Sequence, residues 1–402
     1  MSPLSSDEVM GVKYLYLVFF LIVAAALLQA DAVLTALYLL VGAFAIGRWW
    51  SQRAMAGVQF KRAFTNRVFP GEKVPVRLEV TNTSRLPAIW LQLRDSLPVG
   101  MGISQFQEVV FLGGRQTRVF EYVLQPSRRG FYQIGPLSLY SGDVLGLLDT
   151  QRREGGADHL TVYPKIVPLT KPDLPSRTPI GSLRHAHPIY EDPSRVFGKR
   201  DYKVGDSLRR VDWKSTAALG RLQVKQFEPS ISLETLVLLD MCRADFDAQR
   251  WVDATELAVV VAASLANWVV AQKQSLALST NGKDPLGAAA PINVPMRKGR
   301  AHLMRVLDVL ARIEAADAMP CDELLRCERP RLPWGTTVAV ITGKVSDALF
   351  DELFAAQRAG VNSVIVMCGP VSHVSEVRRR AHRFGIAAYH IRSEREMDAW
   401  RR

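Results

Sequence analysis

Cysteine is scarce in this 402-residue chain, and the few that occur are far apart. No C-x-x-C pair and no dense framework is formed by Cys242, Cys321, Cys327 and Cys368. Structural zinc sites and disulfide scaffolds both need closely spaced cysteines, so this spacing argues against either. We therefore expect reduced, buried thiols of the kind found in cytosolic proteins.

Motifs that carry chemistry are also missing. The chain has no G-x-x-x-x-G-K-[ST] loop, so we expect no ATP hydrolysis by the chain itself. Its histidines are scattered, and no Ser-His-Asp or Cys-His arrangement is visible. His185 and His187 lie in a proline-rich stretch, where surface histidines are commoner than metal ligands. The sequence predicts a protein that is not an enzyme and has no catalytic residues and no cofactor.

Charge is absent from two apolar runs near the start, residues 14–28 and 32–46. Each is a little shorter than the roughly 20 residues of a membrane-spanning helix. Flanking residues extend the second run, because Arg48 can reach the interface and Trp49 and Trp50 suit it. The turn between the runs is too short for a domain, so the pair predicts a transmembrane helical hairpin. A signal peptide and a buried soluble hairpin are the weaker alternatives.

Basic residues without any acid follow the second run: Arg48, Arg53, Lys61, Arg62 and Arg67. Flanks of this kind stay on the cytoplasmic side of a membrane. We therefore expect a chain anchored in the bacterial inner membrane with its bulk facing the cytoplasm. The same residues account for part of the net charge of +12.

The rest of the chain changes character twice. Short alternating strands such as "KVPVRLEVTNTS" are separated by turns, which predicts an immunoglobulin-like β-sandwich. A Pro-, Ser- and Arg-rich stretch over residues 164–198 predicts an extended linker. Strands and helices then alternate, as in a doubly wound α/β fold. The predicted segments are a hairpin, a sandwich, a linker with a basic motif, and an α/β domain, at 1–50, 51–165, 166–232 and 233–402.

The basic motif follows the linker. "VGDSLRRVDWKSTAALG" predicts one helix that begins at Asp206 or Ser207 and ends at Gly220. Its apolar face would hold Leu208, Val211 and Leu219, and Arg209 would pair with Asp212. The following "RLQVKQFE" predicts a strand that buries Leu222 and Val224.

This layout and motif resemble bacterial proteins of the domain-of-unknown-function family numbered fifty-eight. The resemblance covers essentially the whole chain. It implies a von Willebrand factor type A-like α/β module and an association with MoxR-type AAA+ ATPases. The residues that carry it most specifically are Arg200, Asp201, Tyr202, Gly205, Asp206, Arg209, Arg210, Asp212, Trp213, Lys214, Gly220 and Arg221.

The resemblance also raises the question of a metal site. Type A domains that bind metal carry D-x-S-x-S after their first strand, and this chain has Asp240, Cys242 and Ala244 there. A thiol is a poor Mg²⁺ ligand and a methyl group is none. We therefore predict a degenerate site without metal, in which Asp240 holds loop backbone or pairs with Arg243.

Three interpretations of the basic segment stay open. Arg200, Asp206, Arg209 and Asp212 could form an ion-pair network that joins the segment to the α/β domain. The segment could instead dock an acidic partner through Arg and Trp. Catalysis is the third. We expect no nucleic-acid binding, because the aromatic residues fit packing better.

The favoured hypothesis is a non-catalytic adaptor, anchored in the lipid bilayer, for a MoxR-type AAA+ ATPase and an unidentified client protein. The alternatives are a Mg²⁺-dependent adhesion-type binder and, less favoured, a hydrolase.

Overall fold

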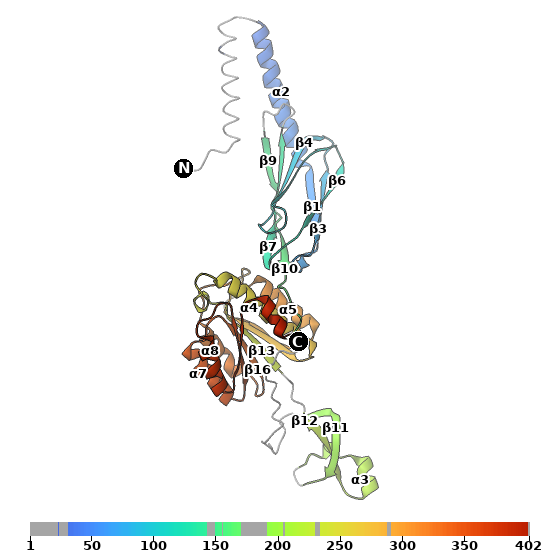
Figure 1. Cartoon of the computed structure of the whole chain (residues 1–402). Helices are drawn as coiled ribbons and strands as arrows, with labels where there is room; N and C mark the ends of the chain where they lie inside the picture. Colours follow the sequence, from blue (N-terminus) through green and yellow to red (C-terminus); the bar gives the residue numbers. More distant parts are fainter. Residues whose placement is uncertain are drawn as a thin grey trace. The chain divides into compact units, whose positions relative to one another are not determined.

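The computed structural model describes residue 23 and residues 31–142, 149–154, 156–169, 191–203, 206–229, 234–287 and 291–400. The chain divides into two compact units, residues 1–165 and 166–402 (Figure 1). Residues 14–28, the first limb of the predicted hairpin, lie outside the described residues apart from Val23.

Helix α2 (Asp31–Ala56) contains the second predicted apolar run and continues past it. Its N-terminal part exposes large apolar side chains, with Tyr38 72% and Leu39 70% exposed. Its last turns are different, because Ala54 and Met55 are buried in the core of the first unit. The helix therefore crosses the predicted boundary at residue 50 and ends inside the sandwich.

Three antiparallel or mixed sheets make up the rest of this unit, in the orders β1-β3-β6, β2-β10-β7 and β5-β4-β8-β9. The alternation in β3 buries Val74, Val76, Leu78 and Val80, as the sequence predicts. The strands are β1 (Val58–Ala63), β2 (Arg67–Val68), β3 (Val74–Asn82), β4 (Ala88–Ser96), β5 (Gln105–Leu112), β6 (Thr117–Leu124), β7 (Gly130–Ile134), β8 (Leu137–Gly142), β9 (Asp149–Glu154) and β10 (Asp158–Val162).

The second unit contains a hairpin that the sequence did not predict. Strand β11 (Glu191–Asp201) pairs antiparallel with β12 (Gln223–Pro229). Between them lie the short 3-10 helix η1 (Leu208–Arg210) and helix α3 (Trp213–Leu219). The prediction of an extended linker up to residue 198 is therefore wrong from residue 191 onward, because the partner strand that orders it is distant in sequence.

The α/β part of this unit is a six-stranded sheet in the order β15-β14-β13-β16-β17-β18. All neighbours are parallel except β14 and β15, which run antiparallel. This is the doubly wound order that strand and helix alternation predicts. The strands are β13 (Glu234–Leu239), β14 (Ser275–Thr280), β15 (Ile292–Arg297), β16 (Thr337–Thr342), β17 (Asn362–Cys368) and β18 (Ala387–Ile391).

Helices cover this sheet. The short 3-10 helices η2, η3 and η4 were not predicted, and neither were two longer elements, β15 and α6. Both lie among prolines, which signal breaks in a pattern. The helices are η2 (Arg243–Asp245), α4 (Trp251–Ala271), α5 (Arg300–Arg312), α6 (Cys321–Glu328), η3 (Arg329–Arg331), α7 (Asp347–Arg358), α8 (Val374–Arg383) and η4 (Glu394–Trp400).

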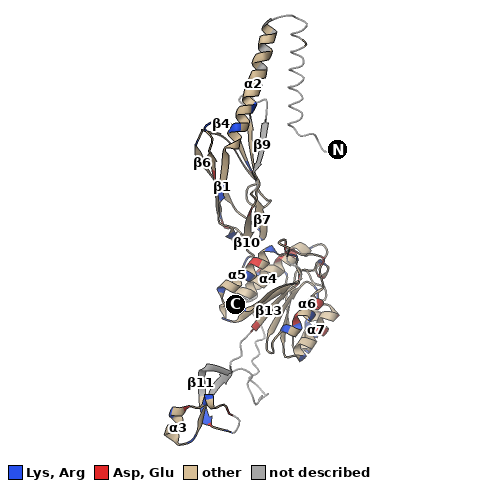
Figure 2. Ribbon diagram, turned by 180° about the vertical axis from the view of Figure 1, so that it is seen from behind, with Lys and Arg blue, Asp and Glu red and all other residues tan. Residues whose placement is uncertain are grey.

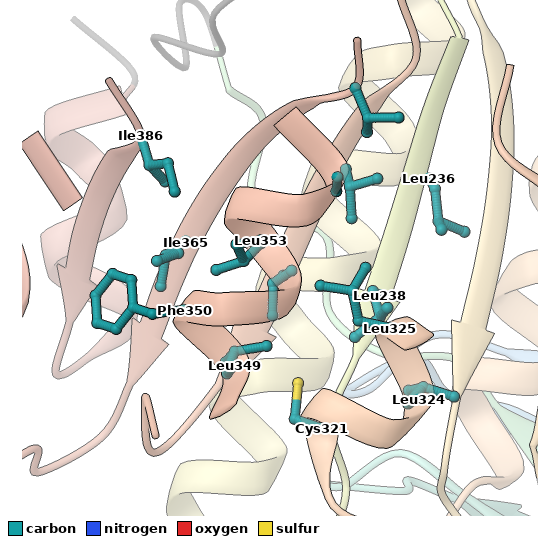
Figure 3. Close-up of a cluster of buried hydrophobic side chains, with 14 of the residues drawn as sticks. Leu236, Leu238, Cys321, Leu324, Leu325, Leu349, Phe350, Leu353, Ile365 and Ile386 are labelled. Atoms are coloured by element: carbon teal, nitrogen blue, oxygen red, sulfur yellow. The ribbon is translucent and has the colours of Figure 1, made fainter. Parts of the chain in front are cut away.

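The core of the α/β part packs strand residues against α6 and α7 (Figure 3). Leu236 and Leu238 from β13 meet Leu324 and Leu325 from α6 in it. By length and composition α4 could cross a membrane, but 72% of its apolar window is buried. It packs against the sheet, so its apolar character belongs to the core.

Candidate functional site

The central motif folds into a small lobe, here called the basic lobe (described residues 191–203 and 206–229). Its predicted single helix is split at Val211, whose backbone is extended and forms a bridge with Val224. Asp212, rather than Asp206 or Ser207, caps α3 by accepting from the Ser215 N–H at 3.1 Å. Gly220 ends the helix in the left-handed conformation, as predicted. The split arises because a non-local bridge outweighs local helix propensity.

Three aspartates of the basic lobe, Asp201, Asp206 and Asp212, make ion pairs within it. Asp206 accepts from both terminal nitrogens of Arg200 at 2.7 Å, and Asp212 pairs with Lys199 at 2.9 Å. Asp201 pairs with Arg221 at 3.3 Å. The predicted Arg209–Asp212 pair is therefore replaced by one to Lys199 from the neighbouring strand.

These pairs change the titration of the acids. The hydrogen bond from Arg200, followed by the one from the Lys203 N–H, lowers the pKa of Asp206 to about 2. The hydrogen bond from Lys199 likewise lowers the pKa of Asp212. The charges of Asp206 and Asp212 are thus already matched by Arg200 and Lys199.

Large apolar side chains stand exposed on the basic lobe beside basic ones. Trp213 is 67% and Leu208 64% exposed, where the sequence predicted Leu208 on a buried stripe. Arg209 and Lys214, next to them in the chain, are exposed as well. Buried Val211, Gln223 and Val224 form the small interior, so the predicted inward Leu222, which is 39% exposed, is on the wrong side.

The remaining motif residues are placed as follows. Tyr202 is half-buried, and its N–H donates to the Leu222 carbonyl at 2.9 Å. Arg210 is exposed. Gly205 lies outside the described residues.

The second candidate site is Asp240, which directly follows β13 and is completely buried. Its Oδ1 accepts from the Cys242 N–H and from Asn281 Nδ2, both at 2.9 Å. Its Oδ2 accepts from Thr342 Oγ1 at 2.7 Å. Arg243 instead lies over the Trp251 ring, 4.6 Å from its centroid. Asp240 therefore ties together the ends of three neighbouring strands and the loop after β13.

Burial dominates the electrostatics of this centre. Burial, and then the charge of nearby Asp245, raises the pKa of Asp240 to about 7. Burial also raises the pKa of Asp245, and its Oδ2 is buried without a hydrogen-bond partner among the described residues. Within the described ranges, no group of three or more His, Cys, Asp or Glu side chains is placed to hold a metal ion. The sequence did not predict that Asn281 contacts Asp240, although Asn281 directly follows β14 as Asp240 follows β13.

A cavity of about 370 Å³ opens beside Asp245 at the carboxyl edge of the sheet. Loops after β13, β16 and β17 line it with groups of both charges, among them Asp247, Lys344, Asp347 and His373. Carboxyl edges of doubly wound sheets are where such folds bind ligands. The mixed lining matches no single small-molecule class.

A third polar centre lies in the sandwich and was not predicted. The side chain of Arg62 is 1% exposed and binds Asp95 Oδ1 at 2.7 Å, and Asp95 is fully buried. The Tyr122 hydroxyl donates to Asp95 Oδ2 at 2.6 Å. Arg62 Nη1 donates to Asp158 Oδ2, also at 2.6 Å. Arg62 therefore belongs to the sandwich interior rather than to the surface flank that the sequence suggested.

Residues 198–396 match the model of a family described as "Protein of unknown function DUF58". The uncharacterized protein YeaD of Bacillus subtilis is 25% identical over 306 residues, covering 74% of this chain and 72% of YeaD.

Solved structures are similar to parts of the chain. The CARDB domain of a Pyrococcus furiosus protein is 15% identical, covers 26% of this chain and 91% of that one, and has a TM-score of 0.21. A von Willebrand factor type A protein from Catenulispora acidiphila is 11% identical, covers 44% of this chain and 42% of that one, and has a TM-score of 0.30.

Proposed function

We propose that the chain is a non-catalytic, membrane-anchored adaptor of this uncharacterized family, and that its basic lobe docks a protein partner. One observation carries the proposal. Three aspartates of the basic lobe, Asp201, Asp206 and Asp212, are held in internal pairs. The side chains that face solvent include Trp213, Leu208, Arg209 and Lys214. Exposed Trp and Arg side chains are typical anchors of protein interfaces.

We infer an acidic partner with an apolar pocket for Trp213. Basic groups on the lobe would steer such a partner and fix its orientation. A MoxR-type AAA+ ATPase is our candidate, because the motif resembles proteins associated with such ATPases. The client that the pair would act on is not assigned.

The membrane anchor in this proposal is a hairpin formed by residues 14–28 and helix α2. In support of this anchor, α2 exposes Tyr38, Leu39 and Ile46 before its buried last turns, as a lipid-facing helix does. We propose the inner membrane, with both units on the cytoplasmic side.

Affinity capture from solubilised membranes tests the docking proposal. The full-length chain is expected to recover an ATPase with an intact phosphate-binding loop, identified by mass spectrometry. Recovery should fall when Trp213→Ala is combined with Arg209→Gln. A matched control, Arg378→Gln with Arg379→Gln, removes exposed charge from α8 instead. Failure to recover any ATPase, or equal recovery by both variants, contradicts the proposal.

A second candidate function is Mg²⁺-dependent binding at Asp240. The unpartnered, buried Oδ2 of Asp245 favours it. Against it, both oxygens of Asp240 already accept hydrogen bonds. Calorimetry separates the two, because the adaptor proposal expects no heat on adding Mg²⁺ beyond that of dilution.

A further inference from the structure

Three segments meet at the end of the sandwich that receives α2, next to the ends of β8 and β9 that the helix also contacts. The Trp50 indole donates to the Pro87 carbonyl at 3.0 Å, which holds the β3–β4 loop level with that residue of the helix. The Arg115 N–H donates to the Ser84 carbonyl at 2.9 Å, which joins the β5–β6 loop to it. We call the surface of these three segments the helix-end face; it comprises residues 47–57, 83–90 and 109–118.

Apolar side chains stand out from the helix-end face. Trp49 is 59% and Phe111 50% exposed, and Ile89 and Trp90 are exposed as well. Their chain neighbours point the other way, since Ala88 and Leu112 are buried in the core. Alternation along β5 turns Phe111 outward, and the irregular register between Ala88 and Leu91 leaves both Ile89 and Trp90 exposed at the same end of the sheet.

The three segments of the helix-end face carry only basic charge, and one acid, Asp149 at the start of β9, lies at the same end of the sheet. The segments contain no Asp or Glu, and their basic residues are Arg48, Arg53, Arg85, Arg115 and Arg118. None of these arginines takes part in an ion pair within the described part of the chain. Basic positions on the ribbon near the end of α2 are visible in Figure 2.

Arg115 adds an independent observation. Its φ is 57°, a left-handed conformation that Gly or Asn adopts more readily. A strained arginine at an exposed turn indicates that its side chain serves a purpose there.

We propose that the helix-end face rests on a bilayer and binds anionic phospholipid headgroups through its arginines. The proposal depends on the membrane anchorage proposed above. If α2 spans the bilayer, Trp49 and Trp50 lie at the interface, where aromatic belts form. The β3–β4 loop is held at the level of Trp50, so Ile89, Trp90 and Arg85 meet the headgroup layer. Both the exposed aromatic residues and the unpaired positive charge match an anionic lipid surface.

Radical footprinting of the full-length chain in nanodiscs tests this contact residue by residue. Trp90 and Phe111 are expected to oxidise more slowly in phosphatidylglycerol-containing discs than in pure phosphatidylcholine discs. Trp334, which is 55% exposed in the other unit, serves as the internal reference. High salt should reduce the difference, because it screens surface charge. Adding inorganic phosphate to neutral discs should not reproduce the protection.

Charge-removing variants sharpen the test. Arg85→Gln with Arg115→Asn should weaken the contact by about fivefold per arginine removed, as judged from the protection of Trp90. Asn suits the left-handed backbone at residue 115, so the change adds no strain. The matched control is Lys73→Gln with Arg128→Gln, which removes two charges at the opposite end of the sandwich.

The outcomes separate this proposal from the anchorage on which it rests. If the chain does not co-elute with nanodiscs, the anchor itself is wrong. If it co-elutes but Trp90 and Phe111 oxidise equally in both lipids, the headgroup contact is wrong. Protection that depends on the number of chains per disc rather than on lipid charge would identify a second copy as the occupant and also overturn it.

Discussion

The sandwich and the basic lobe each contain an Arg–Asp pair with the same geometry and a different environment. Arg62 and Asp95 approach to 2.7 Å with side chains 1% and 0% exposed. Arg200 and Asp206 also approach to 2.7 Å, with side chains 36% and 18% exposed. Water screens the second pair and not the first, so equal distances carry unequal energies.

The comparison explains why motif density is a poor guide to stability. The basic lobe has many charged residues close together in sequence, yet its pairs are open to solvent. The buried pair joins β1 to β4 across 33 residues and leaves no local signal. Its partners Tyr122 and Asp158 come from two further strands.

Breaking the buried pair should have the largest effect. Arg62→Met leaves Asp95 buried without its cation, which costs about 3–5 kcal/mol of unfolding free energy. Urea denaturation with hydrogen exchange at β4 measures it. Arg77→Met, at an exposed position on β3, is the control. An equal loss of unfolding free energy in both variants would contradict a special contribution of the buried pair.

The next effect concerns pH and the other buried carboxylate. Burial raises the pKa of Asp240 from 3.8 to about 7, so the folded state binds more protons than the unfolded state between these values. Stability of the α/β part should therefore fall as pH rises from about 4 to about 7, by on the order of a few kcal/mol.

Asp240→Asn keeps the shape and removes the titration. Its amide can donate to Thr342 Oγ1, which can donate in turn to the Lys344 carbonyl at 3.0 Å. Denaturation at several pH values should show a flatter profile for this variant. An unchanged slope would mean that another group titrates in that range.

A smaller loss is expected from Tyr122→Phe. The change removes one hydrogen bond to buried Asp95 and leaves the two from Arg62, so about 1.5–3 kcal/mol is expected, as for bonds to charged groups. Thermal unfolding of the full chain in detergent measures it. A loss larger than that of Arg62→Met would reverse the assumed ranking within the network.

The smallest effect belongs to the exposed pair. Arg200→Gln should hardly change the denaturation midpoint, because the guanidinium is partly solvated. Since Arg200 holds the pKa of Asp206 at about 2, any stability from this pair is present above about pH 4 and is lost as pH falls toward 2. Amide exchange at Lys203, whose N–H binds Asp206 at 2.9 Å, reports it.

What the sequence predicts well is periodic or local. Alternation gives β3, and the alternation of strands with helices gives the class of the α/β domain, because these patterns follow directly from burial. Gly220 is predicted as a helix end because its left-handed backbone is a local requirement. Asp240 is expected after the first strand of the α/β domain, and it lies there.

What the sequence misses depends on distant partners. The helix break at Val211 comes from its bridge to Val224, and β11 is ordered by pairing with β12. Pro295 interrupts the strand pattern in the sequence of β15. The structure tolerates this proline because β15 is an edge strand. Arg62 reads as a surface cation until Asp95 is placed beside it.

Helix α2 has a mechanical consequence. Ala54 and Met55 are core residues of the sandwich, and Trp50 is fastened to the β3–β4 loop. Helix α2 and the sandwich are therefore joined without a flexible link. If α2 rotated or tilted in a lipid bilayer, the sandwich would rotate or tilt by the same angle.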